Sequence, residues 1–156
     1  MQKILLTILL CCVALCAQDV LRDVQVGNSS FDVVEVAKTD AERAKGLGGR
    51  DYLPDSNAML FIMGAPGPCV FWMKDTLIPL DAVFLDATGK VLLIQTMAVE
   101  PPQSSTETKE GYERRLKRYP CNGMVFSVLE MRAGLAAELG LEKGTRVLSL
   151  SAWRLI

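Results

Sequence analysis

Residues 71–86, FWMKDTLIPLDAVFLD, carry a polar cluster between two apolar runs. Because side chains alternate along a strand, Trp72 and Lys74 are expected to share one face. Pro79 cannot donate to the ladder of a central strand, so the chain should turn or follow a sheet edge there, shortly before Asp81. Asp81 then either accepts backbone N–H groups of the turn, or joins Trp72 and Lys74 in a site with an aromatic wall and two opposite charges.

The absence of histidine from the sequence restricts the chemistry that the chain can perform. It excludes Ser-His-Asp and Cys-His catalysis and removes the commonest metal ligand. An enzyme of this sequence would use carboxylates, and Asp81 and Glu130 form the candidate pair of a hydrolase. No motif indicates a reaction, so catalytic residues stay unassigned. The sequence predicts no cofactor and no resident metal.

Soft-metal handling is an alternative, because thioether and thiolate sulfur suit copper(I). Methionines spread over the folded part of the chain supply such sulfur, together with two cysteines: Met59, Met63, Met73, Met97, Met124, Met131, Cys69 and Cys121. Methionine also fills gaps in apolar cores, and most of these residues lie inside apolar strands, which favours a structural interpretation.

Cys69 and Cys121 each precede a strand-like run, and in an oxidising compartment they are a candidate disulfide. An unstrained bridge that closes a loop of roughly 50 residues stabilises a fold by about 3–4 kcal/mol. Two unrelated small core residues are the alternative interpretation, because the sequence alone does not bring the two Cα atoms within bonding range.

The N-terminus has the pattern of an export signal, a positive charge followed by an almost wholly apolar run over residues 4–15. That run is shorter than the roughly 20 residues that cross a bilayer, so residues 1–17 are expected to be a signal peptide that is cleaved after Ala17. Lipidation at Cys16 is the rival interpretation, although a large residue precedes it where a small one is preferred. The mature chain, residues 18–156, is then periplasmic or extracellular, with membrane contact only through the signal or a lipid anchor.

Strand patterns dominate the remainder, at residues 20–27, 31–37, 58–63, 69–73, 82–86, 90–99, 124–131 and 146–156. Residues 58–63 and 69–73 are predicted to be two buried strands, because glycines and prolines separate them. Residues 82–86 and 90–99 are predicted to form a hairpin.

Short helices are expected at three places in this strand pattern. A capping box that includes Glu42 starts the first, and Gly46 is placed to end it. Favourably spaced charges indicate a second over residues 110–117, and AGLAAELG, residues 133–140, is the third. One mainly-β domain follows, a β-sandwich or jelly-roll-like barrel with two or three short helices.

The formal net charge of −1 gives the chain no overall attraction to nucleic acid. A basic run, RRLKR at residues 114–118, has glutamates beside it at Glu107, Glu110 and Glu113. This pattern is typical of a solvated surface of mixed charge, so no nucleic-acid partner is expected.

Four stretches of the chain resemble, in the same order, the family catalogued as domain of unknown function 192. They cover most of residues 31–150 and read TDAERAKGLGGR, AMLFIM, FWMKDTLIPLDAVFLD and VLEMRAGLAAELGLEKGTRV. The resemblance implies a compact β-sandwich or jelly-roll-like domain with short helices, and it implies no activity. The polar positions that match the family pattern are Glu42, Arg50, Lys74, Thr76, Asp81 and Glu130. The chain departs from that pattern at Gly48, Ala58 and Asp75, and the charge of Asp75 would weaken an anion site beside Lys74.

These polar residues have two interpretations. In the structural one, Glu42 caps a helix, Pro79 and Gly134 shape turns, and Arg50 pairs with Asp81 or Glu130. In the functional one, six residues surround a ligand: Arg50, Trp72, Lys74, Thr76, Asp81 and Glu130. The leading hypothesis is an exported envelope protein that binds a small polar ligand or glycan, or an envelope protein partner. A hydrolase that uses Asp81 and Glu130, and a copper-handling protein, remain the alternatives.

Overall fold

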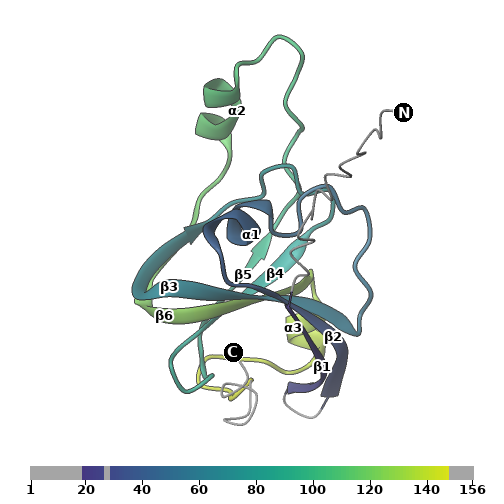
Figure 1. Ribbon diagram of the computed structural model, residues 1–156, viewed down its shortest axis with the longest axis vertical. Helices are drawn as coiled ribbons and strands as arrows, with labels where there is room; N and C mark the ends of the chain where they lie inside the picture. Colours follow the sequence, from purple (N-terminus) through teal and green to yellow (C-terminus); the bar gives the residue numbers. More distant parts are fainter. Residues whose placement is uncertain (1–18, 27–28, 148–156) are drawn as a thin grey trace, which may run out of the picture.

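The computed structural model describes residues 19–26 and 29–147, which form six strands and three short helices (Figure 1). In chain order these are β1 (Asp19–Val26), β2 (Ser29–Ala37), α1 (Asp40–Lys45), β3 (Asn57–Phe71), β4 (Leu80–Leu85), β5 (Val91–Met97), α2 (Lys109–Arg115), β6 (Tyr119–Arg132) and α3 (Leu135–Glu138). The prediction of one mainly-β domain with two or three short helices is confirmed. The expected signal peptide and the end of the expected last strand, residues 148–156, lie outside the described residues.

The six strands form one mixed sheet with the order β1-β2-β3-β6-β4-β5. Neighbouring strands are antiparallel except for β2 and β3, which run parallel. A parallel pair requires a crossover connection, and α1 with the loop over residues 46–56 supplies it. This connection places α1 beside the sheet, where it forms one wall of a cavity.

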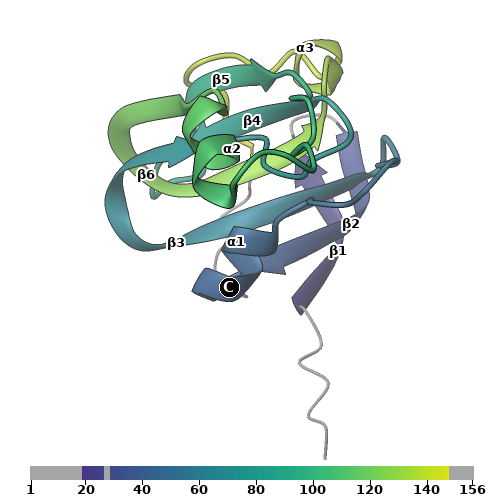
Figure 2. The ribbon, with the colours of Figure 1, turned by 90° about the horizontal axis from the view of Figure 1, so that it is seen from above.

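The alternation of side chains along β6 divides the core in two. Leu129 and Met131 belong to a cluster that also includes Val24 of β1 and Val91 of β5, so the two edges of the sheet share one core. Figure 2 shows the curvature of β3 and β6 that accompanies this arrangement. Val128 belongs to a second cluster, which packs under α1 and the loops that follow it.

β3 is one strand of 15 residues, and the prediction of two separate strands at residues 58–63 and 69–73 is wrong. The ladder between β3 and β6 shifts register between Ile62 and Gly67 and again between Gly67 and Cys69. The glycines and prolines of this stretch therefore form a β-bulge and do not end the strand. The bulge bends β3, and the end of the strand continues to pair with the beginning of β6.

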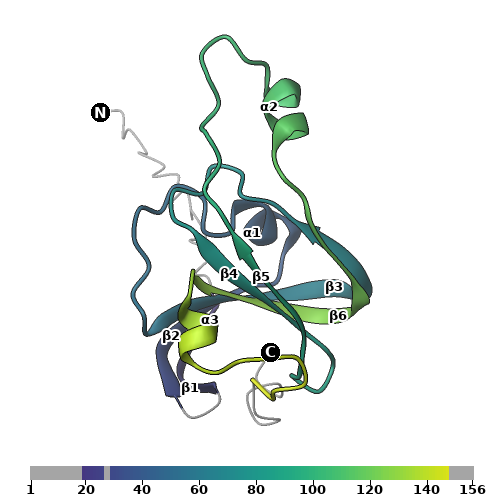
Figure 3. The same cartoon turned by 180° about the vertical axis from the view of Figure 1, so that it is seen from behind.

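A long excursion connects β5 to β6 and carries α2 near its tip (Figure 3). Thr108 caps α2 by accepting a hydrogen bond from the backbone of Gly111. The short surface helix expected from the charge spacing is therefore confirmed, although it begins at Lys109. Within residues 19–26 and 29–147, no helix has both the length and the apolar character needed to cross a membrane.

Candidate functional site

A cavity of about 270 Å³ lies on the face of the sheet that carries Val128 and Glu130. Its walls come from α1 and the turn after it, from β3, and from the loop that follows β3. Leu47, Phe61 and Phe71 give these walls an apolar surface. Glu130, near the end of β6, lies against the cavity as a buried acid, with a side chain that is only 4% exposed.

The strand register fixes the surroundings of Glu130. Its two cross-strand partners are Met59 of β3 and Ala82 of β4, and both are fully buried and apolar. Directly opposed residues of an antiparallel pair share one face, so the carboxyl group is flanked by apolar side chains on both sides. No described residue forms a hydrogen bond or an ion pair with it. Because the group borders the cavity, a molecule in the cavity can reach it.

Burial raises the pKa of Glu130 from its ordinary value of 4.5 to about 8. The cause is desolvation, which penalises the charged carboxylate in an apolar environment. At neutral pH the side chain is therefore mainly a carboxylic acid, which can donate one hydrogen bond and accept others. A strongly raised pKa of a group in a cleft is a feature that functional sites often have, because binding and catalysis need groups with shifted protonation states.

Aromatic packing shapes the wall that the sheet itself forms. Phe71 at the end of β3 lies edge-on to Phe61, with ring centroids 5.3 Å apart, and edge-on to Phe84, at 5.7 Å. Gly46 ends α1 with a φ of +47°, and a Cβ at this position would lie 3.3 Å from the ring of Phe61. Glycine therefore allows α1 to pack closely over the aromatic wall.

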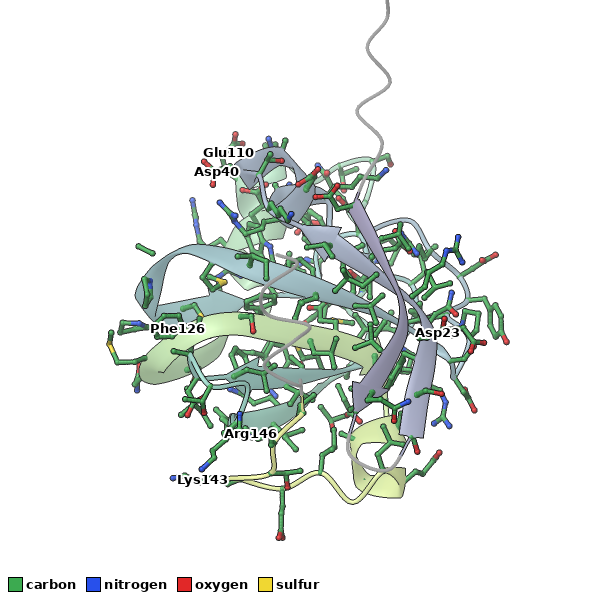
Figure 4. The ribbon with its side chains drawn as sticks, turned by 60° about the horizontal axis from the view of Figure 1, so that its bottom comes forward. Asp23, Asp40, Glu110, Phe126, Lys143 and Arg146 are labelled. Atoms are coloured by element: carbon green, nitrogen blue, oxygen red, sulfur yellow. The ribbon has the colours of Figure 1, made fainter. Side chains whose placement is uncertain are left out.

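Three cationic side chains and one anionic side chain line the cavity: Arg43, Lys45, Lys74 and Asp40. Arg43 is held in place, because it pairs with Asp40 and donates to the backbone oxygens of Lys38 and Ile62. Lys45 is exposed and pairs with no carboxylate of the described residues. Figure 4 places Asp40 on α1, far from the basic residues Lys143 and Arg146 at the other end of the molecule.

Lys74 and Trp72, both predicted site residues, line the cavity but also support α2. Lys74 forms an ion pair with Glu113 of α2, and this hydrogen bond raises the pKa of the lysine. The guanidinium of Arg118 lies 4.4 Å from the centre of the Trp72 ring and covers one of its faces by a cation–π contact. That contact occupies part of the aromatic surface that the sequence suggested for a ligand.

Asp75, which the sequence suggested would weaken an anion site, is not part of the cavity lining. It has a φ of +54°, and its backbone N–H donates to the hydroxyl of Tyr112 over 3.0 Å. That hydroxyl in turn donates to the Asp75 carboxylate. Thr76 follows, is nearly buried, lines the cavity and donates its hydroxyl to the Lys74 oxygen.

Asp81 does not join the site. Its register partner in β6 is Met131, whereas Glu130 pairs with Ala82, so the two carboxyl groups lie on opposite faces of the sheet. Asp81 is 2% exposed and accepts hydrogen bonds from the hydroxyl of Thr96 at 2.7 Å and the backbone of Ala136 at 3.1 Å. It therefore fixes α3 to β4, and no carboxylate pair of the hydrolase type exists here.

Arg50 lies outside the cavity lining, and its predicted pairing with Asp81 or Glu130 is wrong. Its guanidinium forms two hydrogen bonds with the carboxylate of Glu35 in β2, at 2.5 and 2.7 Å. Glu35 raises the pKa of Arg50 through these bonds. The loop carrying Arg50 folds over β2 and not over β4, which the sequence did not indicate.

The structural roles assigned to three other residues agree with the geometry. The carboxylate of Glu42 accepts from the backbone of Lys38 and Thr39, which completes the capping box of α1. The carbonyl of Pro79 accepts from the backbone of Ala133 at 3.0 Å. Gly134 has a φ of +87°, a conformation that favours glycine, and it precedes α3.

Most of the sulfur-bearing side chains among the described residues lie in the two cores. Met59, Met73, Met97 and Met131 are buried, and Met124 is exposed, so the buried methionines give the copper hypothesis no exposed thioether cluster. In residues 19–26 and 29–147, no three histidine, cysteine, aspartate or glutamate side chains meet in a metal-binding arrangement. The thiols of Cys69 and Cys121 are free, although the two residues are directly opposed in the ladder of β3 and β6.

Sequence reasoning missed Arg43, Lys45, Leu47 and Phe61 as residues of the cavity. Arg43 and Lys45 belong to a six-residue helix, so helical periodicity gave no sign of which face covers the sheet. The pattern that could have identified the cavity is the glycine at position 46, which permits the close approach of α1 to Phe61.

Comparisons with known proteins support the fold. The family model DUF192, described as uncharacterized ACR, matches residues 23–149. A solved protein of unknown function from Novosphingobium aromaticivorans is similar to this chain, with a TM-score of 0.67 and 31% identity, and the match covers 86% of this chain and 88% of that chain. A solved structure from Sinorhizobium meliloti, described as a candidate transcription regulator, has a TM-score of 0.58 and 29% identity over 76% of this chain and 81% of that chain. The comparison with curated proteins gave no match.

Proposed function

This chain belongs to the DUF192 family, and from the cavity beside Glu130 we propose that it is a binding domain for a small polar ligand. One observation carries the proposal. Glu130 is a buried acid with apolar neighbours on both sides, it has no partner among the described residues, and it faces a cavity. Buried polar groups of folded proteins nearly always have a hydrogen-bond partner, so an unpartnered acid favours a ligand that supplies one.

The size and lining of the cavity limit the ligand. Sites for drug-sized molecules usually have volumes of about 300–1,000 Å³, so a cavity of about 270 Å³ suits a smaller molecule. Apolar walls and a single deep polar group favour one compact body with a hydrogen-bonding group at one end. A monosaccharide is within this range, whereas a longer glycan would also require a free aromatic platform, and Arg118 covers one face of Trp72.

We also propose that the protein works in the cell envelope after export. The support is the pattern of residues 1–17, a positive charge followed by a short apolar run. Cell fractionation with N-terminal sequencing tests this: a periplasmic or secreted chain that starts near Gln18 agrees with a signal peptide. A chain that carries a lipid on Cys16 indicates a lipoprotein, and a cytoplasmic chain that keeps its N-terminus contradicts export.

A thermal-shift screen of the purified protein tests the binding proposal. The library contains monosaccharides, amino acids, organic acids, amines and nucleosides, and three proteins are compared: wild type, Glu130→Leu and Asp81→Asn. A compound that binds the folded state stabilises it by an amount that grows with the logarithm of its concentration over its Kd, so the melting temperature rises with concentration. We expect at least one compound to stabilise wild type and Asp81→Asn, and to stabilise Glu130→Leu much less, because leucine has no hydrogen-bonding group.

Asp81→Asn is the matched control, because it changes a buried carboxylate on the opposite face of the same strand pair. A library that leaves wild type unchanged contradicts small-ligand binding and directs the search toward an envelope protein partner. Equal stabilisation of all three proteins shows that a ligand binds elsewhere.

The remaining alternatives have less support. A hydrolase mechanism would need a second free carboxyl group beside Glu130, whereas Asp81 lies on the other face of the sheet and Asp40, which lines the cavity, is paired with Arg43. The description of the Sinorhizobium meliloti protein concerns transcription, whereas the net charge of −1 here gives no electrostatic basis for nucleic-acid binding. We therefore propose no nucleic-acid partner.

A further inference from the structure

We infer that the cavity selects a small organic anion that also carries a hydroxyl or carbonyl group, with the charge held at the rim near Lys45 and the second group hydrogen-bonded to Glu130. This inference rests on the binding function proposed above and names the chemical class of the ligand. It follows from three features of the cavity. These are the charge at the exposed rim, where Lys45 lies, the hydrogen-bonding capacity of Glu130 at the buried bottom, and the apolar character of the remaining lining.

The rim carries an excess of positive charge. Arg43, Lys45 and Lys74 line the cavity, and Asp40 is the one carboxylate among the lining residues that faces solvent. Two of the cations are already engaged, Arg43 with Asp40 and Lys74 with Glu113. Lys45 has no such partner among the described residues, so its ammonium group is available to an incoming anion.

At the bottom of the cavity, Glu130 offers a hydrogen-bond donor instead of a negative charge. Because burial in an apolar environment keeps the Glu130 carboxyl protonated at neutral pH, it does not repel an anionic ligand. Its O–H can donate to a hydroxyl or carbonyl oxygen of the ligand. The neighbouring Thr76 hydroxyl already donates to the Lys74 carbonyl, so Glu130 is the side-chain donor that remains at the bottom of the cavity.

The charged groups around Glu130 agree with this selection. On α1 these are Asp40, Arg43 and Lys45, and on the loop after β3 it is Lys74. The residues opposite Glu130 on β3 and β4 are apolar, and Asp81 lies on the far face of the sheet. Arg43 and Lys74 are each paired with a carboxylate, so a cationic ligand would chiefly meet the charge of Lys45 at the entrance, and like charges disfavour binding.

The apolar lining of the cavity limits the body of the ligand. Leu47, Phe61 and Met63 are lining residues that carry no charge. A short alkyl chain or one aromatic ring buries apolar surface here, which contributes roughly 25 cal/mol per Å² of area removed from water. An inorganic anion has no such surface, so a free phosphate or sulfate is expected to bind poorly.

Two matched series of compounds test the inference by isothermal titration calorimetry on the purified full chain. The first is para-hydroxyphenylacetate, para-hydroxyphenylacetamide and tyramine, and the second is ω-hydroxyhexanoate, its amide and the corresponding amino alcohol. Each series keeps one body and one hydroxyl and changes the charge from negative to neutral to positive. We expect the anion to bind most tightly, with an affinity that falls as salt increases.

Variants assign the two ends of the ligand. Lys45→Gln is expected to weaken binding of the anion by roughly threefold to tenfold and to leave the amide unchanged. Glu130→Leu, which removes the hydrogen-bonding group, is expected to weaken binding of the hydroxylated anion more than that of the matching anion without a hydroxyl, phenylacetate. Lys143→Gln, at the far end of the molecule, is the matched control for loss of one positive charge (Figure 4).

The inference is overturned if the amide or the amine binds as tightly as the anion, or if none of the anions binds. Failure of the binding function itself looks different, because it requires that no compound of the broad screen stabilises wild type more than Glu130→Leu. A neutral or cationic ligand that depends on Glu130 would therefore preserve the binding function and refute the anion selectivity.

Discussion

Asp81 and Glu130 are both buried carboxyl groups on neighbouring strands, yet they lie on opposite faces of the sheet. The reason is the register, since Asp81 is opposed by Met131 and Glu130 is opposed by Ala82. Asp81 has two hydrogen-bond donors and holds α3, whereas Glu130 has none and faces the cavity. Two residues of similar type and burial therefore differ in role, one in structure and one in the candidate site.

Replacing Asp81 by asparagine is expected to lower stability and to leave ligand binding intact. The amide can accept from only one of the two donors, so either the Thr96 hydroxyl or the Ala136 N–H loses its partner. An unsatisfied buried polar group lowers the free energy of unfolding by about 1–3 kcal/mol. Urea denaturation of Asp81→Asn and wild type measures the difference. A stable variant that has lost ligand binding would contradict this assignment.

Replacing Glu130 by glutamine should change how stability depends on pH. The pKa of Glu130 is about 8 in the folded protein against 4.5 ordinarily, so the folded state retains a proton that the unfolded chain releases. This group therefore stabilises the fold least at high pH: its contribution is full below pH 4.5 and is lost as pH rises toward 8. The loss is about 1.4 kcal/mol per pH unit within that window.

Urea denaturation at several pH values between 5 and 8 tests this, with wild type and Glu130→Gln measured side by side. The difference between the two proteins is expected to shift steadily in favour of Glu130→Gln as pH rises. Glu110→Gln, which changes an exposed acid on α2, is the control and should show no such trend. A difference that is independent of pH would indicate that Glu130 is ionised in the folded protein.

Cys69 and Cys121 are predicted to form a disulfide when an oxidised disulfide reagent is supplied. Directly opposed residues of an antiparallel pair have Cα atoms about 4.5–5.5 Å apart, within the range that a disulfide requires. Burial, with Cys121 nearby, raises the pKa of Cys69 to about 11, so exchange should be slow at neutral pH and faster in mild alkali.

Incubation with oxidised glutathione, followed by mass spectrometry of the intact chain, measures the reaction. Cys69 attacks the reagent and releases one glutathione, and Cys121 then displaces the second, so the chain loses two hydrogen atoms. The bridge should stabilise the fold by about 2–4 kcal/mol, and dithiothreitol should reverse this gain. A chain that keeps both thiols open to alkylation, or that gives only glutathione adducts, contradicts the prediction; Cys69→Ser is the control.

Removing the hydroxyl of Tyr112 is expected to loosen the α2 excursion. This hydroxyl accepts from the Asp75 backbone and donates to the Asp75 carboxylate, which ties α2 to the loop after β3. Tyr112→Phe should increase amide hydrogen exchange over residues 98–118 while the sheet core stays protected. Tyr52→Phe, at a side chain that is 72% exposed, should change neither. Unchanged exchange in Tyr112→Phe would show that other contacts hold α2.

The features that were predictable from sequence are those set by nearby residues. The capping box of α1 involves Thr39 and Glu42, three positions apart, and it forms as expected. The hairpin of β4 and β5 is likewise local. The continuity of β3 was not predictable in this way, because its glycine- and proline-rich stretch could end a strand or form a bulge, and pairing with the distant β6 decides the outcome.

The candidate site depends mostly on relations that distant segments create. Glu130, Trp72, Lys74 and Thr76 were selected from their types and the family pattern, and they do line one cavity. The separation of Asp81 from Glu130 depends on the register of β4 against β6, since a shift by one residue would reverse the faces. The pairing of Arg50 with Glu35 depends on the path of a loop, for which periodicity carries no information.

The most direct test of this account is an NMR titration of the Glu130 carboxyl carbon in protein labelled with ¹³C at glutamate side chains, with Glu130→Gln used to assign the signal. The account predicts that this carboxyl group titrates near pH 8 and that a bound ligand shifts the titration. A Glu130 that titrates near its ordinary value of 4.5 would contradict the account, because the group would then be solvated or paired and no protonated acid would face the cavity.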